Sequence, residues 1–185
     1  MGRHEIATAA LRLLNVDPTA SMADVASAAG VSRATLHRHF AGREELIRML
    51  GDLSIESWRQ ALDTAGIDAA VESGDAEQLR TALSDLCGQL VRDAQEYGFA
   101  LTEPSLETDD EIVAASEIEQ NRELAFYSAA QAAGVLRPDL PVAWIGHSVF
   151  GLLVALRESL RRGDIAVRDA ERLLRETLLR GIAAA

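Results

Sequence analysis

The chain of 185 residues is 48% hydrophobic and 25% charged, which is enough to build a real core in one domain or in a small domain joined to a larger one. It contains no window of about 18 apolar residues and no apolar N-terminal run, so we expect neither a membrane span nor a signal peptide but a cytoplasmic protein. Its net charge of −11 argues against nucleic-acid binding if the chain is taken as a whole.

The charge is, however, unevenly distributed along the chain. Residues 1–50 contain six Arg and five acidic residues, a net charge of +1, whereas the remaining residues contain 12 Arg and 24 acidic residues, a net charge of −12. An acidic C-terminal part repels DNA and helps to orient the N-terminal part toward it.

The composition favours an all-α fold, because Ala, Leu, Glu and Arg dominate and only four prolines occur. Residues 1–15 are predicted to form the first helix, whose apolar side contains Ile6, Ala9, Ala10, Leu13 and Leu14. A loop over residues 16–20 follows.

Residues 21–40 are predicted to form two short helices joined by a tight turn. Ser21 is a favourable N-cap, and Asp24 follows it at the spacing of a capping box. Gly30 ends the first helix at a position where a left-handed residue is needed. Ser32 caps the second helix, whose inward residues are Leu36 and Phe40.

The outward side of this second helix carries Arg33, Ala34, His37 and Arg38. This face contains no acid, so it suits DNA phosphates and base edges. The two helices form either a helix-turn-helix, whose second helix enters the major groove, or an ordinary helical hairpin within a core.

The segment AGVSRATLHRHFAGREELI, residues 29–47, resembles the signature of the tetracycline-repressor (TetR) family of bacterial transcription regulators. His37 stands where that family most often has a Tyr that contacts phosphate, and Arg43 stands where it usually has Lys. The resemblance implies DNA contacts by Ser21, Ser32, Arg33, Ala34, Thr35, His37, Arg38 and Arg43.

The family resemblance implies a homodimeric regulator, usually a repressor, that binds a palindromic operator in double-stranded DNA and is released by a small-molecule effector. It implies about nine helices, with a DNA-binding domain over residues 1–47 and a ligand-binding and dimerisation domain over residues 48–185. We expect no cofactor, no metal, no membrane partner and no enzymatic activity, because no nucleophile–base pair or phosphate-binding loop is evident. The alternative is a dimeric helical ligand-binding or scaffold protein whose helix-turn-helix is vestigial.

The rest of the chain is predicted to contain long amphipathic helices over residues 43–65, 76–97, 109–133, 141–162 and 165–182. Residues 66–75 are predicted to be a polar connector, and residues 99–108 an irregular crossing. The acidic start of the helix over 109–133 is interpreted most simply as a solvated face, and alternatively as a contact for a cationic partner or ligand.

Two sets of residues in this part are assigned to function as hypotheses. The candidate ligand pocket is mostly apolar, which suggests a hydrophobic or aromatic ligand. Alternatively, each of its residues is a plain core residue, and a buried core thiol is the simpler interpretation of Cys87. The residues assigned to this pocket are Trp58, Leu86, Cys87, Leu90, Phe99, Phe126, Tyr127, Trp144 and His147. The last two helices either close the core of their own chain or form a four-helix dimer interface through Val149, Leu152, Leu156, Leu160, Ala170, Leu174 and Leu178.

Overall fold

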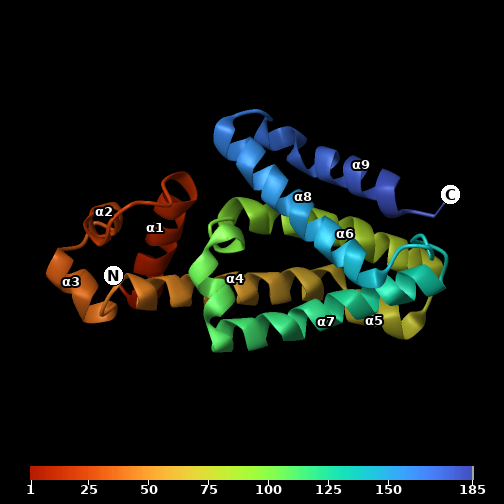
Figure 1. Cartoon of the computed structure of the whole chain (residues 1–185), viewed down its shortest axis with the longest axis horizontal. Coiled ribbons are helices and arrows are strands. Elements are labelled where there is room, and N and C mark those ends of the chain that lie inside the picture. Colours follow the sequence, from red (N-terminus) through yellow and green to blue (C-terminus); the bar gives the residue numbers. More distant parts are fainter. Residues whose placement is uncertain (185) are drawn as a thin grey trace.

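The computed structural model describes residues 1–184, and within them nine α-helices form two bundles that share one long helix (Figure 1). The N-terminal bundle consists of α1 (Arg3–Val16), α2 (Met22–Ala28), α3 (Arg33–His39) and the start of α4 (Arg43–Ala65). The C-terminal bundle adds α5 (Ile67–Ser73), α6 (Ala76–Glu96), α7 (Asp110–Ala132), α8 (Val142–Arg162) and α9 (Ala170–Ile182). Three short 3₁₀ helices lie in the connections: η1 (Ala100–Thr102), η2 (Pro104–Thr108) and η3 (Val167–Asp169).

The segment from α2 through α3 forms as its sequence predicts. Ser21 Oγ accepts the Asp24 N–H at 3.3 Å, and the Asp24 carboxylate accepts the Ser21 N–H at 2.8 Å, which closes the capping box. Gly30 has a φ of +65°, a left-handed conformation in which the lack of a Cβ removes the steric cost. Ser32 Oγ then accepts the Thr35 N–H at 3.1 Å and begins α3.

One apolar cluster holds the N-terminal bundle together. Ile6 and Leu14 of α1 are fully buried beside Leu36 and Phe40 from the α3 region and Leu46 of α4. Full burial of one such side chain contributes about 1.5–3 kcal/mol. This cluster fixes the orientation of α3 relative to α1 and α4.

The buried side of α1 differs from the predicted one by a small rotation about the helix axis. The buried residues are Ile6, Ala7, Ala10, Leu11 and Leu14. Ala9 and Leu13 are only half-buried. The reason is that α1 packs against three helices, α2, α4 and α6, whose positions decide which side of α1 is buried. Sequence periodicity alone does not give those positions.

α4 connects the two bundles. It contains 23 residues, which corresponds to about 34 Å at 1.5 Å per residue. Leu46 and Leu50 near its start belong to the N-terminal cluster, whereas Leu62 near its end belongs to the C-terminal core. Gly66, with a φ of +69°, ends it at the predicted position.

The C-terminal bundle is built around α6, which packs against α4, α5, α7, α8 and α9. Leu79, Leu83, Leu86 and Leu90 of α6 are buried in its core. α6 is therefore the central helix of the C-terminal bundle.

Two segments differ from their predicted structure. The expected connector over residues 66–75 contains α5, because Ile67 and Ala70 are one turn apart and both bury against the bundle. Gly66 and Gly74 allow left-handed turns at its two ends. The last helix begins at Ala170, and η3 occupies part of the stretch before it.

An ion-pair network around the buried carboxylate of Glu119 joins α4, α5 and α7, where the sequence suggested a solvated acidic face. Glu119 is 1% exposed, and its carboxylate accepts from Arg59 Nε at 2.8 Å and from an Arg122 nitrogen at 2.7 Å. Arg122 also lies 2.6 Å from carboxylate oxygens of Asp63 and Asp68. The hydrogen bonds of Arg122 raise its guanidinium pKa. The prediction of a solvated face is therefore wrong for Glu119, because Arg59 of the facing helix α4 and Arg122 of α7 itself cover its carboxylate.

Candidate nucleic-acid interface and ligand cavity

The outward face of α3 is free of intramolecular partners. Arg33, Ala34, His37 and Arg38 are exposed, whereas Leu36 points into the core. Within residues 1–184, neither arginine forms a salt bridge or donates a side-chain hydrogen bond. α3 lies at one end of the molecule, away from the C-terminal bundle (Figure 1). Two guanidinium groups are thus available to donate to phosphates or bases.

Arg43 is held differently from these two arginines. Its guanidinium nitrogens donate to the backbone carbonyl of Ala20 at 2.5 Å and to that of Pro18 at 2.7 Å. Arg43 therefore ties the loop before α2 to the start of α4. Its role as a DNA contact stays a prediction, and any phosphate must share the group with these carbonyls.

Asn15 at the end of α1 joins the N-terminal bundle to the end of α6. Its Nδ2 donates to the carbonyls of Gln95 at 3.3 Å and Glu96 at 2.6 Å, which are among the last carbonyls of a helix and lack intrahelical partners. Its Oδ1 accepts the Phe99 N–H at 2.7 Å. The Phe99 side chain is 2% exposed in the N-terminal cluster, so the segment after α6 is anchored in that bundle.

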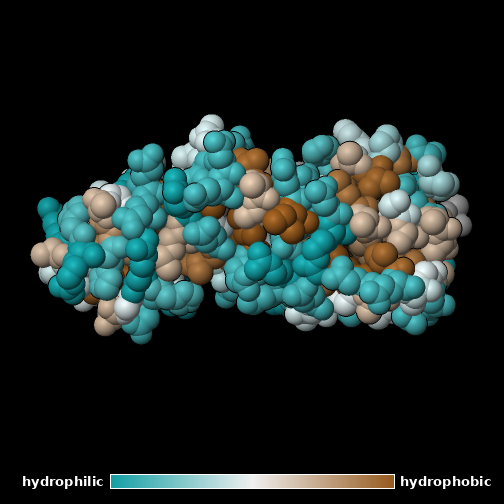
Figure 2. Space-filling view, turned by 90° about the horizontal axis from the view of Figure 1, so that it is seen from below, coloured by the Kyte–Doolittle hydropathy of each residue, from teal (hydrophilic) through white to brown (hydrophobic). Residues whose placement is uncertain are grey.

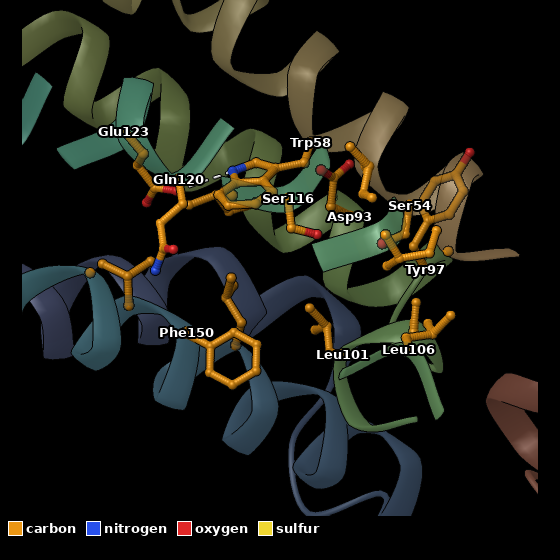
Figure 3. A pocket seen from close by; sticks show the side chains of 18 of the residues that line it. Ser54, Trp58, Asp93, Tyr97, Leu101, Leu106, Ser116, Gln120, Glu123 and Phe150 are labelled. Carbon is orange, nitrogen blue, oxygen red and sulfur yellow. Dashed lines mark hydrogen bonds between the residues drawn. The ribbon is translucent and has the colours of Figure 1, made fainter. Parts of the chain in front are cut away.

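A cavity of about 520 Å³ lies in the C-terminal bundle, among α4, α6, α7, α8 and the η1–η2 segment. Figure 3 shows Trp58, Tyr97 and Phe150 around it, each from a different element. Phe150 is 48% exposed, so the cavity opens to solvent beside α8. This volume is within the range that accommodates a small organic ligand.

Glu123 forms one wall of the cavity with both carboxylate oxygens engaged. Oε2 accepts the indole N–H of Trp58 at 3.1 Å (Figure 3), and Oε1 accepts a short hydrogen bond from the Tyr127 hydroxyl. Burial raises the pKa of the Glu123 carboxyl and that of the Tyr127 hydroxyl. Glu123 therefore fixes the orientation of the Trp58 ring in the cavity wall.

Asp93 of α6 is a second carboxyl in the cavity wall, and its side chain is half-buried. Its Oδ1 accepts the Ser57 hydroxyl at 2.7 Å, and no other described side chain or N–H donates to it. Burial raises the pKa of Asp93 to about 6. This carboxyl changes its charge close to neutral pH.

The structure brings together only some of the residues predicted to form a ligand pocket. Trp58, Leu90 and His147 line the cavity. Phe99 lies in the N-terminal cluster, and Trp144 is 60% exposed on α8. The others pack in the core behind the wall: Leu86, Cys87, Phe126 and Tyr127. Burial raises the pKa of the Cys87 thiol to about 11, in keeping with a core residue.

Most residues predicted for a dimer interface are already buried within one chain. Val149, Leu156, Ala170, Leu174 and Leu178 belong to the chain's own core, and Val149 lines the cavity. Leu152 and Leu160 are half-buried. The five core positions thus leave little side-chain surface for a partner, because α8 and α9 pack on each other and on α6.

The surface of the C-terminal bundle retains apolar areas. Figure 2 shows hydrophobic side chains gathered near the middle of the molecule and again toward the end remote from α2 and α3. Within residues 1–184, no helix is apolar over enough of its length to cross a membrane.

A helix-turn-helix with a free basic face, joined by one long helix to a larger bundle with a cavity, defines a two-domain DNA-binding regulator. The sequence profile described as "Bacterial regulatory proteins, tetR family" matches residues 6–50. The HTH-type transcriptional repressor LfrR of Mycolicibacterium smegmatis is 33% identical over 166 residues, which cover 87% of this chain and 80% of LfrR. The chain therefore belongs to the TetR family of transcriptional regulators.

Other relatives and solved structures agree with this assignment. The HTH-type transcriptional regulator NfxB of Pseudomonas aeruginosa is 27% identical over 175 residues, which cover 93% of this chain and 90% of NfxB. LfrR from Mycobacterium smegmatis in complex with proflavine superposes with a TM-score of 0.76 at 24% identity, covering 99% of this chain and 97% of LfrR. PfmR from Thermus thermophilus gives a TM-score of 0.66 at 20% identity, covering 96% of this chain and 94% of PfmR. These structures confirm the predicted fold.

Proposed function

We propose that the chain is a repressor that binds a palindromic operator as a homodimer through α3 and is released when a small molecule enters the cavity. The observation that carries the proposal is the acid-free outward face of α3, whose Arg33 and Arg38 have no partner within the described residues 1–184. Membership of the TetR family and the similarity to the repressor LfrR support it.

A homodimer would pair α8 and α9 of two chains. Trp144, Gly151 and Ala155 are exposed on α8 and lie at i, i+7 and i+11, which is one face of a helix. The small residues permit close approach of a second helix, and half-buried Leu152 lies beside them. Two-fold symmetry would then set the two α3 helices about one DNA turn apart, roughly 34–36 Å.

Release would act through α6, which reaches both the cavity and the N-terminal bundle. Leu90 and Asp93 of α6 and Tyr97 at its end line the cavity, and the last carbonyls of the same helix are bound by Asn15 of α1. A ligand shifts the equilibrium only if it binds the DNA-incompetent arrangement better than the competent one. Because LfrR has been solved with proflavine, proflavine is the first compound to test.

Selection of bound sequences from random duplex DNA tests the DNA-binding function. We expect an enriched palindrome, and Arg33→Ala or Arg38→Ala should weaken its binding by about 1–3 kcal/mol if the side chain reads a base. Arg80→Ala, on exposed α6 surface, is the matched control and should bind as wild type. Adding proflavine to the complex then tests release.

Two outcomes would contradict the proposal. A dimer that enriches no sequence would favour the alternative of a ligand-binding or scaffold protein with a vestigial helix-turn-helix. A stable monomer in sedimentation equilibrium, together with binding of an isolated half-site, would refute the palindromic dimer while leaving DNA binding intact.

A further inference from the structure

On the basis of the proposed function, we infer that the effector is a cation whose positive charge is met by Asp93, while Glu123 serves to hold Trp58. The two carboxyls lie in the same cavity (Figure 3), but their hydrogen bonding assigns them different tasks.

The ionisable side chains that line the cavity are mostly carboxylic acids. The described lining of the cavity contains no Arg, although Arg supplies every basic side chain of the chain other than its four His. Glu107 and Glu117 are exposed at its edge, and Glu103 is half-buried. An anionic ligand would meet only like charge here, whereas a cation gains favourable interactions with the surrounding carboxylates.

Glu123 is less accessible to a ligand than Asp93, and both of its oxygens are already engaged by the cavity wall. It is 8% exposed, and each of its oxygens already accepts a hydrogen bond, one from Trp58 and one from Tyr127. Each oxygen can accept a second hydrogen bond, but a ligand that drew Glu123 away from the indole or the phenol would leave a polar donor unpaired in the wall. Glu123 is therefore a positioning residue for Trp58.

Of these two carboxyls, Asp93 is the one with an oxygen available to a ligand. Its Oδ1 accepts from Ser57, but within residues 1–184 no group donates to its Oδ2. The side chain is half-buried, and it lines the cavity together with Trp58 and Ser116 (Figure 3). A planar cation stacked near the indole would bring its charge within reach of this free oxygen.

Asp93 is the cavity group whose ionisation a bound cation would change. Arg92 lowers its pKa and Glu96 raises it, both from its own helix, but burial has the largest effect. The other titratable groups of the cavity wall are Tyr97, which follows α6 directly, and groups from the η1–η2 segment, α7 and α8: Glu103, Glu107, Glu117, Glu123 and His147. No arginine lines the wall to compete with a cation for Asp93, and the one histidine there, His147, is exposed on α8.

Cation binding should therefore release a proton from Asp93. Its pKa is about 6 in the empty cavity, and a neighbouring positive charge lowers that pKa. The bound state then holds fewer protons than the free state, so affinity increases as pH rises. Between pH 5 and 7 the gain should be about tenfold, and above pH 7 affinity should level off.

The test compares two planar tricyclic probes of similar size by calorimetric or fluorescence titration. N-methylacridinium is a permanent cation, so its own charge does not depend on pH, and N-methylacridone is its neutral counterpart. We expect Asp93→Asn to bind the cation at least about tenfold more weakly than wild type at pH 7.5, to bind the neutral probe unchanged, and to lose the pH dependence.

Two further variants separate the roles of the two carboxyls. Glu123→Gln should weaken both probes to a similar degree, because Trp58 loses its carboxyl acceptor, and should keep the pH dependence. Asp85→Asn removes an exposed carboxylate from the same helix outside the cavity and should change neither probe. Thermal unfolding of each variant establishes that it is folded.

The outcomes distinguish this inference from the proposed function. If Asp93→Asn binds the cation as wild type does, or if Glu123→Gln alone abolishes the cation preference, the assignment to Asp93 is overturned while ligand binding in the cavity stands. If the wild-type protein binds the neutral probe more tightly than the cation, the proposal of a cationic effector is refuted. Wild type that binds neither probe overturns this inference, and the operator selection described above still decides DNA binding.

Discussion

Replacing Asn15 with Ala should weaken both the fold and the communication between cavity and operator. The substitution removes the hydrogen bonds to the carbonyls of Gln95 and Glu96 and the acceptor for the Phe99 N–H. Each such bond contributes about 0.5–1.5 kcal/mol net, and the bond at 3.3 Å contributes least. Because Asn15 is half-buried and water can replace part of these bonds, we expect a loss of about 1–3 kcal/mol in the free energy of unfolding.

The functional effect is measured as operator affinity with and without a saturating effector. Ligands in coupled systems typically change each other's affinity by about 5–150-fold, and we expect Asn15→Ala to reduce that factor by at least about threefold. Thr8→Ala is the matched control, because it removes a bond within α1, from the Thr8 hydroxyl to the His4 carbonyl. If Asn15→Ala is destabilised but responds to effector as wild type does, the contact is structural only and α6 signals by another route.

Three further substitutions test the remaining contacts. Arg43→Lys keeps the charge but cannot bridge the carbonyls of Pro18 and Ala20. Urea unfolding should therefore show a loss of about 1–2 kcal/mol in the free energy of unfolding. Unchanged stability with weakened operator binding would instead support a direct DNA contact. Arg122→Ala leaves buried Glu119 with Arg59 alone and should cost about 2–3 kcal/mol, a loss that adding Glu119→Gln should partly recover. Asp93 has a pKa of about 6 in the folded chain, above the unfolded value of about 3.9, so wild type loses stability as pH rises through this interval. Asp93→Asn should therefore be more stable than wild type by on the order of 1–3 kcal/mol at pH 8, with the difference vanishing toward pH 4.

The helix-turn-helix could be predicted from sequence because its determinants are local. Ser21 with Asp24, Gly30 and Ser32 act within a few residues of their own positions. α5 was not predicted, because a segment of only seven residues between two glycines resembles a polar connector, and its packing on α6 and α7 stabilises the helix.

The cavity could be predicted only in part, because its shape depends on the rotation and spacing of helices far apart in sequence. Trp58 and Phe99 are both large aromatic residues in apolar surroundings, yet one lines the cavity and the other anchors the segment after α6 in the N-terminal cluster. The burial of Glu119 and Glu123 was hidden for the same reason. Their partners Arg59 and Trp58 lie on α4, at separations of 60 and 65 residues along the chain.

α6 gives the proposed regulator a way to combine three signals. Its wall residue Asp93 exchanges a proton with solvent and meets the proposed cation, and its last carbonyls are bound by Asn15 of the DNA-binding bundle. Linkage is reciprocal, so an effector that lowers operator affinity must itself bind more weakly to the operator complex, by the same factor. If the cation also displaces a proton from Asp93, less effector is needed for release at pH 7 than at pH 5, although operator binding without effector need not change through this group. The proton then sets the effector concentration at which the operator is released, and Asp93→Asn separates this effect from any direct influence of pH on the face of α3.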